Sequence, residues 1–380
     1  MHFDLNEDQR MIREAAREFA EKEIKPIAAK LDEEAEFPAE IVKKLGELGF
    51  MGMMVPEEYD GAGLDTVSYS IAVEEISRAD ASTGVIMSVN NSLVCQPILD
   101  FGNEEVKKKY LPQLASGAAL GAYSLTEPEA GSDAGNVQAT AVLDGDSYIV
   151  NGTKIFVTNG GVADIVLLFV STDKEAGSRG MSALVVEKGY PGFSVGKKED
   201  KMGIRASMTN ELVFEDCRVP RANLVGEEGQ GFKIGLTALD GGRIGIASQA
   251  VGIAQACLDE SVRYSKERKQ FGKTISSFQA IQWMLANMAT RIEASRLLTY
   301  EAAFVKDKGE RYSKHAAMAK LFASETAVDA AIDAVQIHGG YGYMKEYTVE
   351  RLFRDSKITE IYEGTSEIQR LVIAAHLLKG

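Results

Sequence analysis

The sequence predicts a multidomain α+β protein in which a β domain lies between two helical ones. Apolar residues recur at helical spacing over 1–120, alternate with polar residues over 121–230, and return to helical spacing over 231–380. We therefore expect three domains with these bounds: an all-α N-terminal domain, a middle antiparallel β-barrel or sandwich, and a C-terminal helical domain.

The N-terminal segment has helical periodicity from its beginning. Residues 6–31 carry this pattern, with a start near Asn6 or Glu7 and a break at Pro26. Further helices are expected at 38–50, 68–80 and 103–117, and the glycine-rich stretch 57–65 is expected to be a loop.

In the middle segment the hydrophobic period changes to two. Residues 136–160 indicate strands joined by turns, and the Asn151-Gly152 pair is typical of a hairpin turn. More strands are expected at 164–172, 180–188 and 209–220. Because no helical pattern interrupts them, we expect a compact antiparallel sandwich or barrel.

The C-terminal segment predicts long helices. The first is rich in small and apolar residues, as expected of a helix buried on most sides, and the three ranges are 234–268, 277–306 and 315–339. A last helix is expected near Ser366, because Ser366 followed by Gln369 fits a capping box.

Composition excludes several classes of function. The 42 basic and 56 acidic residues give a net charge of −14, which argues against nucleic-acid or anionic-membrane partners. Three separated cysteines without a CxxC pair, and four scattered histidines, predict neither disulfides nor a metal site. The N-terminus lacks a signal-peptide pattern and no apolar run reaches membrane-spanning length, so we expect a cytoplasmic, reduced protein.

Common cofactor and nucleophile motifs are missing from the sequence. It has no GxGxxG between a strand and a helix, no P-loop and no GxSxG, so any hard chemistry is expected to belong to another cofactor. The stretch YSLTEPEAGSDAG (123–135) can offer backbone N–H donors to a ligand, or be a plain interdomain linker. FVTNGG (156–161) can face a planar ring, or merely close a hairpin.

Three stretches of the C-terminal segment also allow two interpretations each. Asp240 and Arg243 lie three apart on one helix face, either as a structural pair or as a grip on a polar ligand. ERKQFGK (267–273) can hold a pyrophosphate or be a solvated helix end. The glycines of QIHGGYGY (336–343) end a helix and allow close approach to a ligand.

The stretch ITEIYEGTSEIQR (358–370) places three glutamates among apolar residues. Glu367 falls in the first turn of the expected last helix, where its charge complements the helix dipole. Glu360 can simply face solvent. Glu363 precedes the helix, between a tyrosine and a glycine, and is the best placed of the three to reach a ligand from a fixed loop.

Taken in order, these motifs resemble the acyl-CoA dehydrogenase family over essentially the whole chain, most closely its short-chain type. The matching stretches are YSLTEPEAGSD, NGTKIFVTNG, DKMGIRAS, LDGGR, ERKQFGK, QIHGGYGY and IYEGTSEIQR. The resemblance implies a C-terminal four-helix bundle, a homotetramer and one FAD per subunit. It also implies oxidation of a short-chain acyl-CoA to the trans-2-enoyl-CoA, with electrons passed to an electron-transferring flavoprotein.

The resemblance implies roles for individual residues. Glu363 matches the catalytic base. Residues matching one wall of the flavin site are Tyr123, Leu125, Thr126 and Ser132. Those matching its other wall are Phe156 and Thr158, and Thr365 and Glu367 match further FAD contacts. Residues matching the set that holds a neighbouring subunit's FAD are Arg268, Phe271, Gln336, Gly339 and Gly340. Residues matching the acyl-CoA site are Ser132, Asp240, Arg243 and Gly364.

At two positions this chain differs from patterns found in other members of the family. Some members carry the base just before the arginine of the LDxxR stretch, and here that position is Gly242, which cannot take a proton. Many members have tryptophan where this chain has Phe156. The alternatives are a branched-chain dehydrogenase, an oxidase-like relative, or a catalytically silent flavin- or CoA-binding scaffold. Residues 85–99 are expected to form part of the acyl pocket floor.

Overall fold

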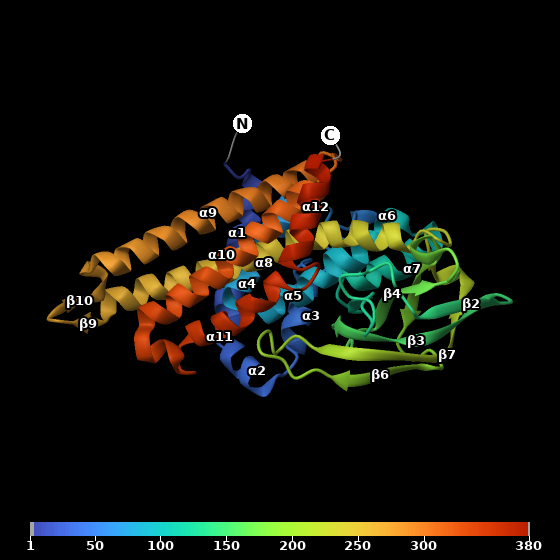
Figure 1. Ribbon diagram of the computed structural model, residues 1–380, viewed down its shortest axis with the longest axis horizontal. Coiled ribbons are helices and arrows are strands. Elements are labelled where there is room, and N and C mark those ends of the chain that lie inside the picture. Colours follow the sequence, from blue (N-terminus) through green and yellow to red (C-terminus); the bar gives the residue numbers. More distant parts are fainter. Residues whose placement is uncertain (1–3, 379–380) are drawn as a thin grey trace.

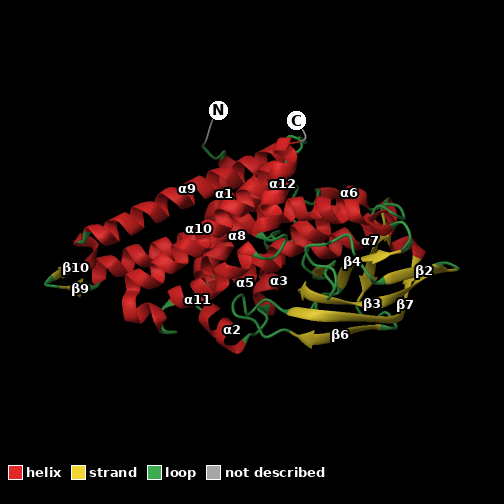
Figure 2. Ribbon diagram, in the orientation of Figure 1, coloured by secondary structure: helices red, strands yellow, loops and turns green. Residues whose placement is uncertain are grey.

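The computed structural model describes residues 4–378, with helices at both ends of the chain and a sheet between them (Figures 1 and 2). The N-terminal helices are α1 (Glu7–Phe19), α2 (Ala28–Glu34), α3 (Ala39–Glu47), α4 (Thr66–Ala79), α5 (Ala81–Ser88), α6 (Gln96–Phe101) and α7 (Glu104–Ala115). The predicted start near Asn6 or Glu7 is confirmed, because α1 begins at Glu7 and Asn6 caps it in a reciprocal capping box with Gln9. The predicted break at Pro26 is also confirmed, since α2 begins after it.

Helices α4 and α5 form the interior of the N-terminal part. Both are buried along almost their whole length, and α4 packs against α1, α5, α8 (Gly231–Glu267) and α9 (Gln279–Asp307). A π-helical segment, Val89–Cys95, continues α5 into α6. Within it, the Asn90 amide accepts a hydrogen bond from the Gly121 N–H at 2.8 Å, which ties these helices to the first strand.

The middle part is an eight-stranded sheet with the order β6-β7-β3-β2-β4-β5-β8 and β1 paired to β4. Its strands are β1 (Gly121–Ser124), β2 (Thr140–Asp144), β3 (Ser147–Thr158), β4 (Ile165–Ser171), β5 (Met181–Glu187), β6 (Phe193–Lys198), β7 (Thr209–Pro220) and β8 (Leu224–Val225). Most pairs are antiparallel, as expected, but β1 and β2 both run parallel to β4. The sheet is therefore mixed rather than purely antiparallel.

The prediction of a hairpin turn at Asn151-Gly152 was wrong. Both residues lie inside β3, where the pairing with β7 shifts register at a bulge. Gly152 has φ +146°, and a Cβ there would lie 2.5 Å from the Ala139 Cβ, so close approach of the backbone requires this glycine. The turn that joins β2 to β3 is at residues 145–146.

The C-terminal part consists of three long helices and two shorter ones. They are α8 (Gly231–Glu267), α9 (Gln279–Asp307), α10 (Ser313–His338), α11 (Thr348–Ser356) and α12 (Ser366–Leu378). The long helices lie side by side, with the small hairpin of β9 (Lys269–Gln270) and β10 (Lys273–Thr274) at the end far from the sheet (Figure 1). Helix α10 packs against all four other helices. The domain bounds at 120/121 and 230/231 stay predictions.

The last helix begins near Ser366, as predicted, but its cap lies one residue earlier than expected. Ser366 is already the first helical residue, and Thr365 is the cap, since its hydroxyl accepts the Ile368 N–H at 3.4 Å. Within residues 4–378, no helix is long and apolar enough to cross a membrane. The same residues contain no cluster of side chains suited to a metal ion.

Candidate active site

Glu363 occupies a tight corner between the short helix Lys357–Glu360 and α12. Its φ is +55°, a left-handed conformation that is uncommon for residues other than glycine, and Gly364 follows with φ +93°. The side-chain amide of Gln369 donates to the carbonyls of Glu363 and Gly364 at 3.2 and 2.7 Å. Lys320 Nζ donates to the Gly364 carbonyl at 2.9 Å. The corner is therefore fixed from both α12 and α10.

The Glu363 carboxyl group points at α8, where Gly242 leaves room for it. A Cβ at Gly242 would collide with Glu363 Oε2. This oxygen is buried and has no hydrogen-bond partner among the described residues. Burial raises the pKa of the Glu363 carboxyl to about 8, while the positive charges of Lys320 and Arg243 act to lower it. A carboxyl group with such a pKa can accept a proton near neutral pH.

The carboxyl group faces a cavity between α5, α8, the sheet and α12. Of the residues predicted to bind ligands, those that line it are Tyr123, Leu125, Thr126, Ser132, Phe156, Thr158, Arg243, Glu363 and Gly364. Val85, Val89 and Leu93 form an apolar wall of this cavity, and the expectation that residues 85–99 form part of the acyl pocket floor stays a prediction. The cavity thus joins segments that are far apart in the sequence.

A buried ion pair holds the loop on one side of this cavity. Lys154 and Glu127 are 0 % and 3 % exposed and lie 2.6 Å apart. Lys154 Nζ also donates to the Leu125 carbonyl at 3.0 Å, and the Glu127 carboxylate accepts the N–H groups of Gln138 and Ala139. One carboxylate therefore clamps both ends of the stretch 125–139, which is more than a plain linker.

Phe156 forms an aromatic edge of the same cavity. It has φ +56° and is 61 % exposed, although it lies in β3. A large exposed apolar ring beside hydroxyl groups of Thr126 and Thr158 suits a planar ligand with polar edges. The cavity is therefore compatible with a flavin ring.

Asp240 and Arg243 form a structural pair, and only one of them reaches the cavity. Arg243 Nη1 lies 2.6 Å from Asp240 Oδ1, and Ser313 donates to the other oxygen of Asp240. Arg243 is 4 % exposed and lines the cavity, with no partner for its Nε among the described residues. Its guanidinium group is therefore held in place and retains a free donor.

A second cavity lies at the far end of α8. Arg268, Gly339 and Gly340 line it together with aromatic residues, and the Arg268 guanidinium lies over the Tyr341 ring at 5.4 Å. Gln336 is exposed on α10 nearby, and Phe271 is 92 % exposed in the turn of the β9–β10 hairpin. Along α8, Arg243 and the helix end at Glu267 are roughly 36 Å apart at 1.5 Å per residue. The two cavities therefore cannot hold the same dinucleotide within one chain.

Two further predicted residues lie beside the Glu363–Gly364 corner but outside both cavities. Thr365 caps α12, and Glu367 is exposed in its first turn, as the sequence predicted. Glu360 is paired with Lys357 and does not simply face solvent. Sequence reasoning missed Lys320, whose contact with the Glu363 corner bridges separate helices and leaves no local signal. It named Gln369 only as part of a capping box with Ser366, whereas the Gln369 side chain donates to the Glu363 and Gly364 carbonyls.

Models of one family match the chain from end to end. They are the N-terminal domain (residues 6–118), the middle domain (122–217) and the C-terminal domain (229–378) of acyl-CoA dehydrogenases. The chain is 54% identical to the short-chain specific acyl-CoA dehydrogenase of Clostridium acetobutylicum over 379 residues, which is 100% of both proteins.

Two solved structures are similar over the full length of both chains. Butyryl-CoA dehydrogenase of Megasphaera elsdenii has 48% identity, a TM-score of 0.98 and 100% coverage of each chain. A chain solved in work on the electron-transferring flavoprotein of Acidaminococcus fermentans has 54% identity, a TM-score of 0.99 and the same coverage.

Proposed function

Because the chain belongs to the acyl-CoA dehydrogenase family, we propose that it oxidises a short-chain acyl-CoA to the trans-2-enoyl-CoA, with Glu363 as the base. The observation that carries this proposal is the Glu363 carboxyl group. It lines the cavity, has an unpartnered oxygen and has a pKa raised to about 8.

Removal of the α-proton of a thioester needs both a base and stabilisation of the negative charge that develops on the thioester oxygen. Glu363 Oε2 would accept the proton, and desolvation makes it a stronger base than an exposed glutamate. The Glu363 backbone N–H donates to no acceptor among residues 4–378, so it is free to donate to the thioester oxygen. Such a donor is typically worth about 3–4 kcal/mol in the transition state.

Members of this family are flavoproteins, and we infer that this chain binds FAD. Tyr123, Leu125, Thr126 and Ser132 would hold one side of the flavin, with Phe156 and Thr158 on the other side and Thr365 and Glu367 nearby. FAD bound there would accept the β-hydrogen as a hydride. The fit rests on the exposed Phe156 ring, the threonine hydroxyls and the clamped loop beside them.

Assembly into a homotetramer is part of the proposal. Arg268, Phe271, Gln336, Gly339 and Gly340 would hold the FAD of a neighbouring subunit. The distance of roughly 36 Å along α8 supports this arrangement, because a second copy of the chain is needed to bring both cavities to one dinucleotide. Sedimentation velocity of the purified protein checks the tetramer.

The substrate and the electron acceptor are inferred from the site and the relatives together. Arg243, held by Asp240, would contact the acyl-CoA beside Ser132 and Gly364, and the wall of Val85, Val89 and Leu93 would contact the acyl chain. The short-chain preference is supported by the similarity to the short-chain specific enzyme of Clostridium acetobutylicum and to butyryl-CoA dehydrogenase of Megasphaera elsdenii. An electron-transferring flavoprotein as acceptor is supported by the neighbour from Acidaminococcus fermentans. A cytoplasmic location stays a prediction.

Anaerobic titration with acyl-CoA thioesters tests the proposed reaction. Butyryl-CoA should bleach the yellow protein, with weaker bleaching by longer chains, and the electron-transferring flavoprotein should restore the colour. Faster bleaching by isobutyryl- or 2-methylbutyryl-CoA would indicate a branched-chain enzyme, and rapid peroxide formation in air would indicate an oxidase. Absence of bleaching by every thioester would contradict the proposal and leave a binding scaffold.

A further inference from the structure

Lys320 is a fully buried charged residue to which the proposed reaction assigns no role. It lies on α10 and is 0 % exposed. Its Nζ donates to the Gly364 carbonyl at 2.9 Å, one residue after Glu363. Within the described part of the chain, it forms no ion pair with a carboxylate at 4.0 Å or less. A buried ammonium group without a paired carboxylate is costly, so a purely structural ion pair does not explain this lysine.

Charged and titratable groups face Lys320 from three neighbouring elements. Glu363 and Glu360 lie on the segment before α12, Glu367 lies in the first turn of α12, and Arg243 lies on α8. Burial lowers the pKa of the Lys320 ammonium to about 8, and the negative charge of Glu363 is the largest influence in the opposite direction. Lys320 and Glu363 therefore stabilise each other's charged forms.

The surroundings of Glu363 contain few other sources of positive charge. Two cations oppose the rise of the Glu363 pKa: Lys320, which has the larger effect, and Arg243. The remaining titratable neighbours are tyrosine hydroxyls of Tyr69 on α4, Tyr123 on β1 and the adjacent Tyr362, which carry no positive charge. Arg243 is already paired with Asp240, so its charge is partly neutralised. Lys320 is therefore the main uncompensated cation near the base.

We propose that Lys320 is a positioning residue for the catalytic base: it anchors the Glu363–Gly364 corner through the Gly364 carbonyl and supplies the positive charge that favours the ionised form of Glu363. This inference rests on the proposed role of Glu363. The anchor matters because both corner residues have positive φ, a conformation that the surrounding contacts must hold. The charge matters because Glu363 must be ionised to accept the α-proton.

Substitution of Lys320 separates these contributions. Lys320→Met removes the charge and the hydrogen bond, Lys320→Gln removes the charge but keeps a donor, and Lys320→Arg keeps the charge. Loss of a nearby cation raises the pKa of a carboxyl group, by about 1–3 pH units for a close partner. The pH at which Glu363 ionises should therefore rise by that amount in Lys320→Met and Lys320→Gln, and Lys320→Arg should keep it near the wild-type value.

Infrared difference spectroscopy of the purified holoprotein without substrate measures this ionisation, with Glu363→Gln as the blank. Because no acyl-CoA is present, the titration reads Glu363 even if the proposed reaction is wrong. The rising limb of the pH profile for anaerobic bleaching by butyryl-CoA should move in parallel. If Lys320→Met does not fold, Lys320→Gln provides the same comparison of charge.

Lys201→Met is the matched control, because Lys201 also has a pKa lowered to about 8 by burial and donates to a backbone carbonyl, that of Ser207 at 2.7 Å, but is not among the charges that act on Glu363. It should leave the ionisation of Glu363 unchanged. An unchanged ionisation pH in Lys320→Met and Lys320→Gln would overturn the proposal. So would a raised ionisation pH in Lys320→Arg equal to that of Lys320→Met, or an equal shift in Lys201→Met.

Discussion

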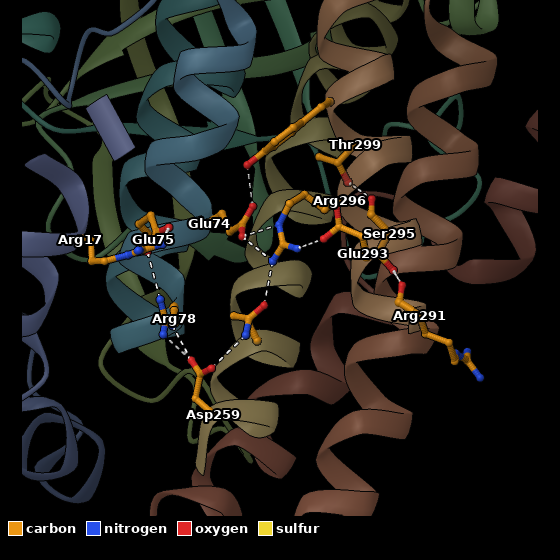
Figure 3. A network of polar contacts seen from close by, with 12 residues as sticks. Arg17, Glu74, Glu75, Arg78, Asp259, Arg291, Glu293, Ser295, Arg296 and Thr299 are labelled. Carbon is orange, nitrogen blue, oxygen red and sulfur yellow. Dashed lines mark hydrogen bonds and ion pairs between the residues drawn. The ribbon is translucent and has the colours of Figure 1, made fainter. Parts of the chain in front are cut away.

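Two glutamates with buried carboxyl oxygens, Glu74 and Glu363, have opposite surroundings. Glu74 lies on α4, is 5 % exposed, and accepts hydrogen bonds from Arg296 Nε and the Tyr300 hydroxyl, both at 2.9 Å. Figure 3 shows it within a continuous network that also contains the pairs Arg17–Glu75 and Arg78–Asp259. Glu363 has an unpartnered carboxyl oxygen. The two sites show that burial alone does not identify a base.

The two carboxylates differ in the protein groups that replace their hydration. The partners of Glu74 come from α9 and join the N-terminal helices to the C-terminal ones, so this carboxylate contributes to assembly of the domains. Glu363 receives only nearby positive charge, from Lys320 and Arg243, and none of it is in direct contact with Oε2. An unsatisfied buried acceptor costs stability, which is expected where a ligand or a transferred proton completes the site.

The largest expected effect is the loss of turnover in Glu363→Gln. The amide keeps the shape of the side chain but cannot accept the proton, so turnover should fall by about 10²–10⁴-fold. Glu74→Gln should keep turnover near that of the wild type. Steady-state oxidation of butyryl-CoA measures both variants at equal flavin content. Equal losses in the two variants would remove the distinction between the two glutamates.

The second effect is on stability, where the two variants should differ in sign. Glu74→Gln removes the buried carboxylate partner of Arg296, leaves only the exposed Glu293, and should lower the unfolding free energy by about 3 kcal/mol. The pKa of Glu363 is raised, so its contribution to stability is present below its ordinary pKa of about 4.3 and is lost as pH rises through about 8. Relative to the wild type, Glu363→Gln should therefore gain stability between these pH values, by at most about 5 kcal/mol.

Denaturant unfolding at fixed protein concentration, repeated across this pH range, measures the stability difference. A Glu363→Gln variant whose stability relative to the wild type does not increase with pH would show that Glu363 has an ordinary pKa. A stability of Glu74→Gln equal to that of the wild type would show that the network in Figure 3 contributes little to the fold.

The smallest of the three effects concerns the space beside Glu363. Gly242→Ala puts a methyl group against Glu363 Oε2, and displacing a catalytic group by about 1 Å can cost about 10²-fold in rate. Gly241→Ala is the matched control, because its methyl group would find the nearest atom outside its own turn of helix at 3.8 Å. The butyryl-CoA bleaching rate compares the two alanine variants. Equal rates would show that the carboxyl group does not depend on this space.

Much of the fold could be predicted because its signals are local. The change of period from helix to strand and back follows the three parts of the chain, and the start of the first helix near Asn6 or Glu7 was readable from the sequence. The Asn151-Gly152 pair shows the limit of such signals. The same dipeptide suits a turn or a bulge, and the approach of Ala139, which the sequence does not reveal, decides between them.

In the candidate site, too, some residues could be recognised from the sequence and others only from the structure. Glu363 was singled out from its own neighbours, since a glutamate between a tyrosine and a glycine just before a helix has a restricted position. The sequence showed that Gly242 is not an acid, but only the structure shows that Gly242 makes room for the Glu363 carboxyl group. Lys320 was missed because a lysine in a helix is usually exposed, and its burial depends on packing between α8, α10 and α12.

The exchange of α-hydrogens of acetyl-CoA with solvent deuterium tests the role of Glu363 most directly. Acetyl-CoA has no β-hydrogen, so exchange reports removal of the α-proton without hydride transfer. The wild-type holoprotein and Glu74→Gln should incorporate deuterium, as followed by mass spectrometry, and Glu363→Gln should do so only at the rate without protein. Incorporation by Glu363→Gln at the wild-type rate would contradict the assignment of Glu363 as the base.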